Sequence, residues 1–222
     1  MHANGVLPLS ASRFAGHLAS PDVHVDNDSR QIRLYFHGAE TPTGMESSQL
    51  TRVAVAADGL AFTTGAEDLG LPYMRVFEYA GWFYGIAMPG VLYRSRDGLT
   101  GFERGPDLLH THIRHCAVLQ RDNRLHVFYT NIGDCPEQIR YLHVQLHDDW
   151  QRWDVSTSVS VLQPMLEWEG ADCPQVASKV GMVNERVNAL RDPAVFSEDG
   201  RDWLLYSIAG ESGIALARLG WR

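Results

Sequence analysis

The chain has 222 residues, of which 45% are hydrophobic and 21% charged, and this balance predicts a soluble globular protein with a sizeable core. Its net charge of −8 and its pI of about 5.6 argue against binding to nucleic acid, whose phosphates require clustered lysine and arginine. No apolar run approaches the roughly 20 residues of a membrane-spanning helix, and Met1–Gly5 do not begin a signal peptide, so we expect a cytoplasmic protein without membrane contact.

The first predicted unit, about 20–66, consists of short strands separated by polar turns. Alternating side chains in Leu34-Tyr35-Phe36 indicate a strand, and Asp58-Gly59 is a strong turn signal. The strands expected in this unit are 22–25, 32–37, 49–56 and 61–63. The segment 6–9 before them is expected to be a strand end or a connector.

The second and third units, about 71–106 and 111–155, repeat the same order of strands and turns. The aromatic run Trp82-Phe83-Tyr84 is the centre of a strand in the second unit. In the third unit, we expect the outer strand at 150–153. The strands expected in these two units are 73–78, 82–88, 90–95 and 102–104, then 113–119, 125–130, 138–146 and 150–153.

A long loop, 163–189, precedes the fourth unit, 188–219. The fourth unit opens on Arg191-Asp192-Pro193, turns tightly at Asp199-Gly200 and returns through two further strands. Only the segment 183–190 has a mildly helical pattern.

Serial antiparallel units with short turns favour a single all-β domain, 1–222, built as a β-propeller. The interval of 39 positions from Arg75 to Arg114 is close to the roughly 40–50 residues of one blade. A β-sandwich is the alternative, although sandwiches do not repeat strand, turn, strand and Asp-Gly so regularly.

Three stretches carry a resemblance to a known group of proteins: Ser20-Pro21-Asp22-Val23-His24, 88–95 (MPGVLYRS) and 191–196 (RDPAVF). Because of these stretches, the chain from about residue 18 to residue 219 resembles the five-bladed β-propeller clan of glycoside hydrolase families 43, 32, 68 and 130. Four blades are recognisable here, so the chain is similar to such a propeller without its first blade.

The resemblance implies roles for particular positions. In family 43 the general-base aspartate lies on the first blade, for which this chain has no counterpart. The general-acid glutamate lies at the start of the third blade, where this chain has Arg75, with Glu78 three positions later. Asp22 matches the family carboxylate that orients the acid and tunes its pKa.

In a propeller, the first strands of the blades line a central channel, so their leading residues are expected to meet in one funnel. The candidate catalytic residues are Asp22, Glu169 and Asp192, and the candidate substrate-binding residues are His24, Arg75, Arg114, His115 and Arg191. Paired carboxyl groups suit glycoside hydrolysis, and arginines suit an anionic sugar, carboxylate or phosphate.

Each candidate also has a structural interpretation. Asp22 fits a turn cap, Arg191 fits an ion pair between blades, and Glu169 depends on the long loop reaching the funnel. We expect no metal and no cofactor, although His110-x-His112-x-x-His115 leaves a metal site as an alternative. The three cysteines match no zinc motif and are expected to be reduced.

The sequence therefore predicts a glycoside-hydrolase-like carbohydrate-active protein that hydrolyses or binds a glycoside in its funnel. The alternative is a non-catalytic propeller, a truncated enzyme remnant that binds sugars or proteins. The expected ligand is a carbohydrate or another small polar molecule. Apolar blade faces left open by a missing blade also predict a homodimer that covers the open edge, or closure as a four-bladed ring.

Overall fold

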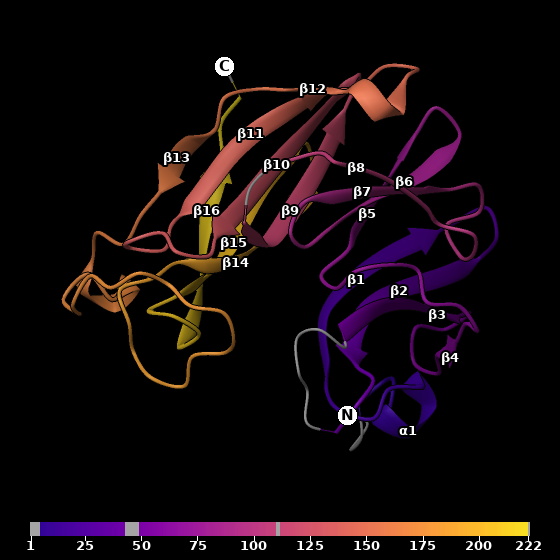
Figure 1. The fold of residues 1–222 in the computed structure, drawn as a ribbon, viewed down its shortest axis with the longest axis horizontal. Helices are drawn as coiled ribbons and strands as arrows, with labels where there is room; N and C mark the ends of the chain where they lie inside the picture. Colours follow the sequence, from indigo (N-terminus) through magenta and orange to yellow (C-terminus); the bar gives the residue numbers. More distant parts are fainter. Residues whose placement is uncertain (1–4, 43–48, 110–111, 222) are drawn as a thin grey trace. The chain divides into compact units, whose positions relative to one another are not determined.

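A computed structural model describes residues 5–42, 49–109 and 112–221 (Figure 1). The regular secondary structure of the described chain is almost entirely β-strand, and the chain divides into two compact units, Met1–Asp107 and Leu108–Arg222. Each unit holds two antiparallel sheets, so the four predicted strand units are confirmed as four sheets. No helix in the described ranges is both long and apolar enough to cross a membrane.

The first sheet follows a short helix, α1 (Leu9–Ser12), at a segment expected to be a strand end or a connector. Its strands, in spatial order, are β1 (Leu18–Asp26), β2 (Gln31–Ala39), β3 (Gln49–Ala56) and β4 (Thr63–Thr64). Because strand side chains alternate between faces, Leu34 and Phe36 of β2 pack with Phe14, whereas Tyr35 packs with the second sheet.

In the second sheet, as in the first, the strands lie side by side in the order in which they occur in the sequence. Its strands are β5 (Arg75–Tyr79), β6 (Trp82–Ala87), β7 (Val91–Ser95) and β8 (Glu103–Asp107). Tyr35 and Val53 of the first sheet share a buried cluster with Met74, Val76 and Tyr93. The core of the first unit therefore lies between its two sheets, where each fully buried large side chain contributes about 1.5–3 kcal/mol.

The third sheet differs from the prediction at its outer edge. Its strands are β9 (Ile113–Arg121), β10 (Arg124–Asn131), β11 (Ile139–Gln145) and β12 (Asp154–Val155), with β13 (Val159–Leu162) also paired to β11. The strand expected at 150–153 is wrong, because Trp150–Arg152 form a 3₁₀ helix, η2. A strand would point Trp150 and Trp153 to opposite faces, whereas here both are buried and Trp153 donates to the carbonyl of His147.

The fourth sheet comprises β14 (Arg191–Glu198), β15 (Arg201–Ile208) and β16 (Gly213–Leu219). The long loop before it contains a 3₁₀ helix, η3 (Glu167–Glu169). The helical tendency expected at 183–190 is not realised. Backbone N–H groups there bond to other strands and loops instead: Leu190 donates to Glu137 and Val187 to Ala209.

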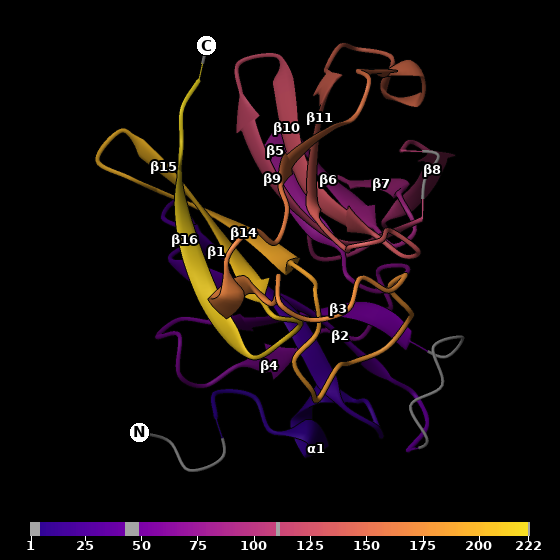
Figure 2. The same ribbon diagram turned by 90° about the vertical axis from the view of Figure 1, so that its left-hand side faces the viewer.

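The core of the second unit lies between the third and fourth sheets. Leu204 and Tyr206 of β15 pack there with Phe128 and Ile139. The opposite face of the fourth sheet is apolar but exposed, with Phe196, Ile214 and Leu216 between 51% and 76% accessible. Figure 2 shows β16 at the edge of this sheet.

Two of the four predicted blade openings, in the first and fourth sheets, contain an irregularity at corresponding places. The pairing of β1 with β2 shifts between Ala19 and Asp22, and that of β14 with β15 shifts between Arg191 and Ala194. At each shift one residue has a positive φ, Ser20 at 49° and Asp192 at 48°. Such bulges redirect side chains. Here they lie next to Asp22 on β1 and at Asp192 on β14, so they set the directions of these two charged side chains.

Candidate functional site

The candidate site of the first unit begins with a carboxylate–histidine pair on β1. Nε2 of His24 lies 3.1 Å from Oδ2 of Asp22, which also accepts a 2.8 Å hydrogen bond from the backbone N–H of Val76 on β5. Burial alone would raise the pKa of Asp22, but the His24 hydrogen bond, the charge of Arg75 and the Val76 N–H together lower it. Asp22 is therefore ionised at neutral pH.

Arg75, at the start of β5, joins this pair. Its guanidinium donates to the backbone carbonyl of Ser20 at 3.0 Å, beside the bulge of β1. The structure thus brings together three of the predicted residues, Asp22, His24 and Arg75, at the seam between the first two sheets. Their roles toward a substrate stay predictions.

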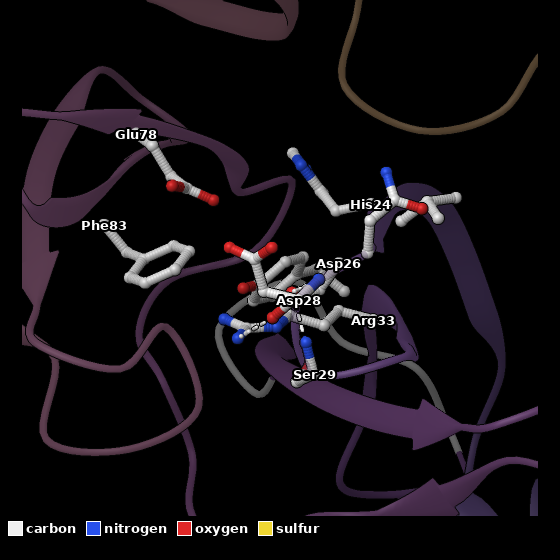
Figure 3. A pocket seen from close by; sticks show the side chains of 10 residues that line it. His24, Asp26, Asp28, Ser29, Arg33, Glu78 and Phe83 are labelled. Carbon is white, nitrogen blue, oxygen red and sulfur yellow. Dashed lines mark hydrogen bonds and ion pairs between the residues drawn. The ribbon is translucent and has the colours of Figure 1, made fainter.

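A pocket of about 530 Å³ lies along this seam (Figure 3). Arg33 and Tyr35 of β2 line it from the first sheet, while Glu78 and Phe83 line it from the second. The remaining lining residues are His24, Val25, Asp26, Asn27, Asp28 and Ser29, from β1 and the turn that follows it. The pocket therefore combines carboxylates, a guanidinium, an imidazole and two aromatic rings.

Arg33 is the most constrained group in the pocket. Nη2 donates to Asp26 Oδ2 at 2.8 Å, and Nη1 donates to the carbonyl of Asp97 at 2.6 Å. Its guanidinium carbon also lies 4.7 Å from the centre of the Phe83 ring. Hydrogen bonds from the backbone and hydroxyl of Ser29, followed by Arg33, lower the pKa of Asp26 to about 2, so this carboxylate is an acceptor near neutral pH.

Tyr35 and Glu78 complete the two facing walls. The Tyr35 hydroxyl donates to the carbonyl of Gly98 at 2.8 Å, and burial raises its pKa to about 12. The His24 ring meets the Tyr35 ring edge-on at 5.5 Å. Figure 3 shows the exposed Glu78 carboxylate pointing from β5 into the space opposite His24.

A second histidine lies deeper in the first unit. His37 on β2 is 1% exposed, and neither ring nitrogen has a hydrogen-bond partner among the described residues. Its ring centre lies 3.9 Å from that of Tyr73. Burial, followed by the charges of His17 and Arg75, lowers the pKa of His37 to about 3, which keeps the ring neutral.

In the second unit, Arg114 and Arg191 converge on Glu137, a residue with no exposed surface. Nε of Arg114 donates to Oε1 at 3.0 Å, and Nε of Arg191 lies 2.8 Å from Oε2, although poorly aligned for a hydrogen bond. Burial raises the pKa of Glu137, while the two arginines oppose this rise. Substrate binding by the arginines stays a prediction, and this burial favours a structural role.

His115 and Asp192 are also brought together. Nδ1 of His115 contacts Oδ1 of Asp192, and the Ser207 hydroxyl donates to Oδ2 of the same carboxylate at 3.1 Å. Asp192 lies in a bulge and has a positive φ, so its side chain and that of the preceding Arg191 point to different environments. The Arg191 side chain is buried beside Glu137, whereas that of Asp192 is 30% exposed. A carboxylate that orients a histidine is chemically versatile, but a catalytic role for Asp192 stays a prediction.

Glu169, in η3, is bonded mainly within its own loop. Its Oε2 accepts hydrogen bonds from the backbone N–H groups of Met165 and Leu166 at 2.9 and 3.0 Å, and its Oε1 accepts one from the Tyr206 hydroxyl at 3.4 Å. The residue is 6% exposed. These bonds close the start of η3, so we leave Glu169 out of the proposed site.

The histidine cluster lies only partly in the described chain. His110 lies outside the described residues, whereas His112 and His115 are described. Across residues 5–42, 49–109 and 112–221, no three His, Cys, Asp or Glu side chains gather closely enough to hold a metal ion.

Arg33 and Asp26 in the pocket, and Glu137 beside Arg114 and Arg191, were not predicted as site residues from the sequence. Arg33, Tyr35 and His37 occupy alternate positions of an otherwise apolar strand, which was an available signal for a functional face. Glu137 had no comparable signal, because its partners come from strands distant in the sequence.

Comparisons with known proteins place this geometry in context. No family model matches the chain. It is 32% identical over 246 aligned residues to "Uncharacterized protein R118" of Acanthamoeba polyphaga mimivirus, covering 99% of this chain and 68% of that protein.

Glycoside hydrolases are among the solved structures with the same fold. An α-L-arabinanase of Cellvibrio cellulosa in complex with arabinohexaose matches with a TM-score of 0.62 at 13% identity, covering 98% of this chain and 79% of the other. The β-xylosidase/α-arabinofuranosidase CoXyl43, from a compost metagenome and in complex with xylotriose, gives 0.62 at 13% identity, covering 98% and 74%. The fold is therefore a β-propeller of the glycoside hydrolase type, and the four sheets are its recognisable blades.

Proposed function

The chain belongs to the family of the mimivirus protein R118, and we propose that it binds a saccharide in the pocket between its first two sheets. The observation that carries this proposal is the set of polar groups fixed around one hollow. Arg33 is held by Asp26 and the Asp97 carbonyl, while Tyr35 is held by the Gly98 carbonyl. Groups fixed before a ligand arrives lose little conformational freedom on binding.

The chemistry of these groups suits sugar hydroxyls. The ionised carboxylate of Asp26 accepts hydrogen bonds, and the exposed carboxylate of Glu78 supplies a further acceptor on the facing wall. Phe83 offers an apolar surface to the C–H groups of a sugar ring. The complexes of the structural neighbours with arabinohexaose and xylotriose support a carbohydrate as the class of ligand.

Hydrolysis is the second candidate function. It requires one carboxylic acid that donates a proton and one carboxylate, roughly 5–10 Å apart. Glu78 on β5 and Asp26 at the end of β1 line facing walls of the pocket, and this arrangement is the observation that favours a reaction. In this proposal Glu78 donates the proton, because the lowered pKa of Asp26 keeps that group ionised.

Calorimetric titration with arabinohexaose, xylotriose and cellotriose tests binding. We expect saturable binding of at least one sugar, and Kd values at least about tenfold higher for Glu78→Gln and Phe83→Ala, equivalent to about 1.4 kcal/mol. Glu103→Gln, an exposed carboxylate on β8 that pairs with Arg94, is the matched control. Absence of binding to all three sugars, or equal affinities for the pocket variants and the control, would contradict the proposal.

Turnover of a panel of aryl glycosides separates hydrolysis from binding alone. If the protein is an enzyme, Glu78→Gln and Asp26→Asn lose turnover, whereas Glu103→Gln retains it. If no glycoside is cleaved but sugars bind, the pocket is a binding site and the hydrolytic candidate is rejected.

A further inference from the structure

Among the described residues, the fourth sheet ends in an open strand edge. The first three sheets each have a strand beyond the third, namely β4, β8 and β12, whereas the fourth sheet ends at β16. Within the described chain, the backbone of β16 pairs only with β15. An edge of seven residues with unpaired N–H and C=O groups is a template for another strand.

An apolar groove of about 350 Å³ adjoins this edge within the second unit. We call it the edge groove. Its main lining residues are Phe128, Tyr141, Leu162, Ala217, Leu219 and Trp221. An added strand directs alternate side chains to one face, so a strand beside β16 would place every second side chain on the groove side.

The wall formed by Trp221 is held in place. Its indole N–H donates to Oδ2 of Asp202 at 2.6 Å, and the His126 ring centre lies 4.4 Å from that of Trp221. Asp202 is 3% exposed and also pairs with Arg121. The groove is therefore a formed feature of the unit rather than a gap between loose side chains.

The end of the edge groove carries positive charge. A second hollow of about 520 Å³ shares Arg218, Leu219 and Trp221 with the groove and adds Arg201. The carboxylate of Asp202 in this hollow is already bonded to Trp221 and paired with Arg121. The two arginines therefore favour an acidic group beside the C-terminal end of β16.

We propose that β16 and the edge groove bind an extended peptide segment of a partner protein by strand addition. Every strand pair in the four sheets is antiparallel, so the segment runs antiparallel to β16. Its bulky apolar side chains, at alternate positions, fill the groove, and acidic residues at its N-terminal end face Arg201 and Arg218. Such binding combines main-chain hydrogen bonds with pockets for alternate side chains.

A second copy of this chain fits the groove less well. Antiparallel pairing of β16 with its own copy, centred on Leu216, places Ala215 opposite Ala217 on the groove side. These methyl groups are too small to fill 350 Å³. The chemistry thus favours a segment with larger side chains over the homodimer that the sequence predicts.

Synthetic peptides test the proposal by fluorescence anisotropy. The probe is acetyl-Asp-Asp-Leu-Thr-Leu-Thr-Leu-Thr-amide, compared with a peptide in which Lys-Lys replaces Asp-Asp and one with the block order Leu-Leu-Leu-Thr-Thr-Thr. We expect the probe to bind at least about tenfold more tightly than either comparison, equivalent to about 1.4 kcal/mol. Ala217→Phe, which fills the groove, weakens probe binding at least tenfold, whereas Val25→Phe on β1 leaves it unchanged.

A double variant that reverses the charge of two arginines tests the proposal independently of Ala217→Phe. Arg201→Glu with Arg218→Glu is expected to reverse the preference, so that the Lys-Lys peptide binds more tightly than the Asp-Asp peptide. No binding of the probe, equal binding of all three peptides, or a preference unaffected by the reversal overturns the proposal. A dimer in sedimentation equilibrium that Ala217→Phe abolishes would assign the edge to a second copy instead.

Discussion

The carboxylate of Asp22, on the edge strand of the first sheet, accepts a 2.8 Å hydrogen bond from the backbone N–H of Val76, on the edge strand of the second sheet. The same oxygen, Oδ2, also pairs with His24 on β1. It therefore has one partner in each of the two sheets. The residue that resembles a family carboxylate is consequently part of the framework of the first unit.

Replacing Asp22 should therefore reduce stability as well as ligand binding. Asp22→Ala leaves the Val76 N–H without its acceptor, and we expect the free energy of unfolding in urea to fall by about 1–3 kcal/mol. Asp28→Ala, at an exposed turn position, should change it by less than about 0.5 kcal/mol. Equal effects of the two substitutions would show that the bond to Val76 contributes nothing measurable.

His37 should make the first unit sensitive to acid. In the unfolded chain histidine takes up a proton near pH 6.5, but the folded pKa of His37 is about 3. Between these values the unfolded state binds more protons, so the free energy of unfolding falls as the pH drops, by up to about 1.4 kcal/mol per pH unit. Above pH 6.5 this contribution is constant.

Urea titrations at pH 7, 6 and 5 measure this effect. His37→Phe should flatten the dependence, whereas His112→Phe, at an exposed position, should leave it unchanged. A wild-type slope that persists in His37→Phe would refute the assignment to His37.

Neutralising Glu137 should strongly destabilise the second unit. Glu137→Gln leaves the buried guanidinium groups of Arg114 and Arg191 without their shared counter-charge, and we expect a loss of about 3–5 kcal/mol. Glu211→Gln removes only the outer, 35%-exposed partner of Arg191 and should cost less than about 1 kcal/mol. Thermal unfolding followed by circular dichroism compares the two variants, and similar melting temperatures would contradict the prediction.

Alanine substitutions at two glycines of one turn distinguish the cost of backbone strain from the cost of a steric clash at the pocket. Gly98 and Gly101 have φ values of 71° and 58°, so alanine at either should cost about 1–2 kcal/mol. A Cβ at Gly98 would also lie 2.7 Å from Arg33 Nη1 and 2.7 Å from the Phe83 ring, whereas one at Gly101 meets nothing within 4 Å. Gly98→Ala should therefore lose at least about 1 kcal/mol more.

Sugar titration of the same pair provides a second measurement. Gly98→Ala should weaken saccharide binding, because it displaces Arg33 from Phe83, while Gly101→Ala should not. Unchanged sugar affinity in Gly98→Ala would argue that the Arg33–Phe83 arrangement is unimportant to the pocket.

Much of the fold follows from local sequence signals. Strands such as β2 and β15 combine alternating side chains with nearby tight turns, so their existence and order could be predicted. The prediction failed at Trp150–Trp153, where aromatic residues typical of a strand form a 3₁₀ turn capped by Asp149. There the burial of two indoles outweighs the local preference for a strand.

The site was predictable only in part. Asp22 and Arg75 open strands in the predicted units, and His24 shares a strand face with Asp22, so the repeat of units indicated that the three belong together, although β1 begins earlier, at Leu18. Arg33 could not be placed, because one of its partners, the Asp97 carbonyl, lies 64 positions away and depends on how two sheets pack. Glu169 was predicted as a site residue, but its carboxylate bonds to backbone N–H groups three and four positions away. This local role was not recognised because the surrounding segment was predicted only as a loop.

The buried carboxylate of Glu137 also constrains the order in which the second unit folds during synthesis. Arg114 precedes Glu137 in the chain, but Arg191 leaves the ribosome about 50 residues after it. Until the fourth sheet is made, the charge of Glu137 is therefore opposed by one arginine in place of two. Until then, burial of Glu137 is opposed by its own desolvation. The third sheet is thus expected to stay incompletely packed, and open to chaperones, until β14 has been translated.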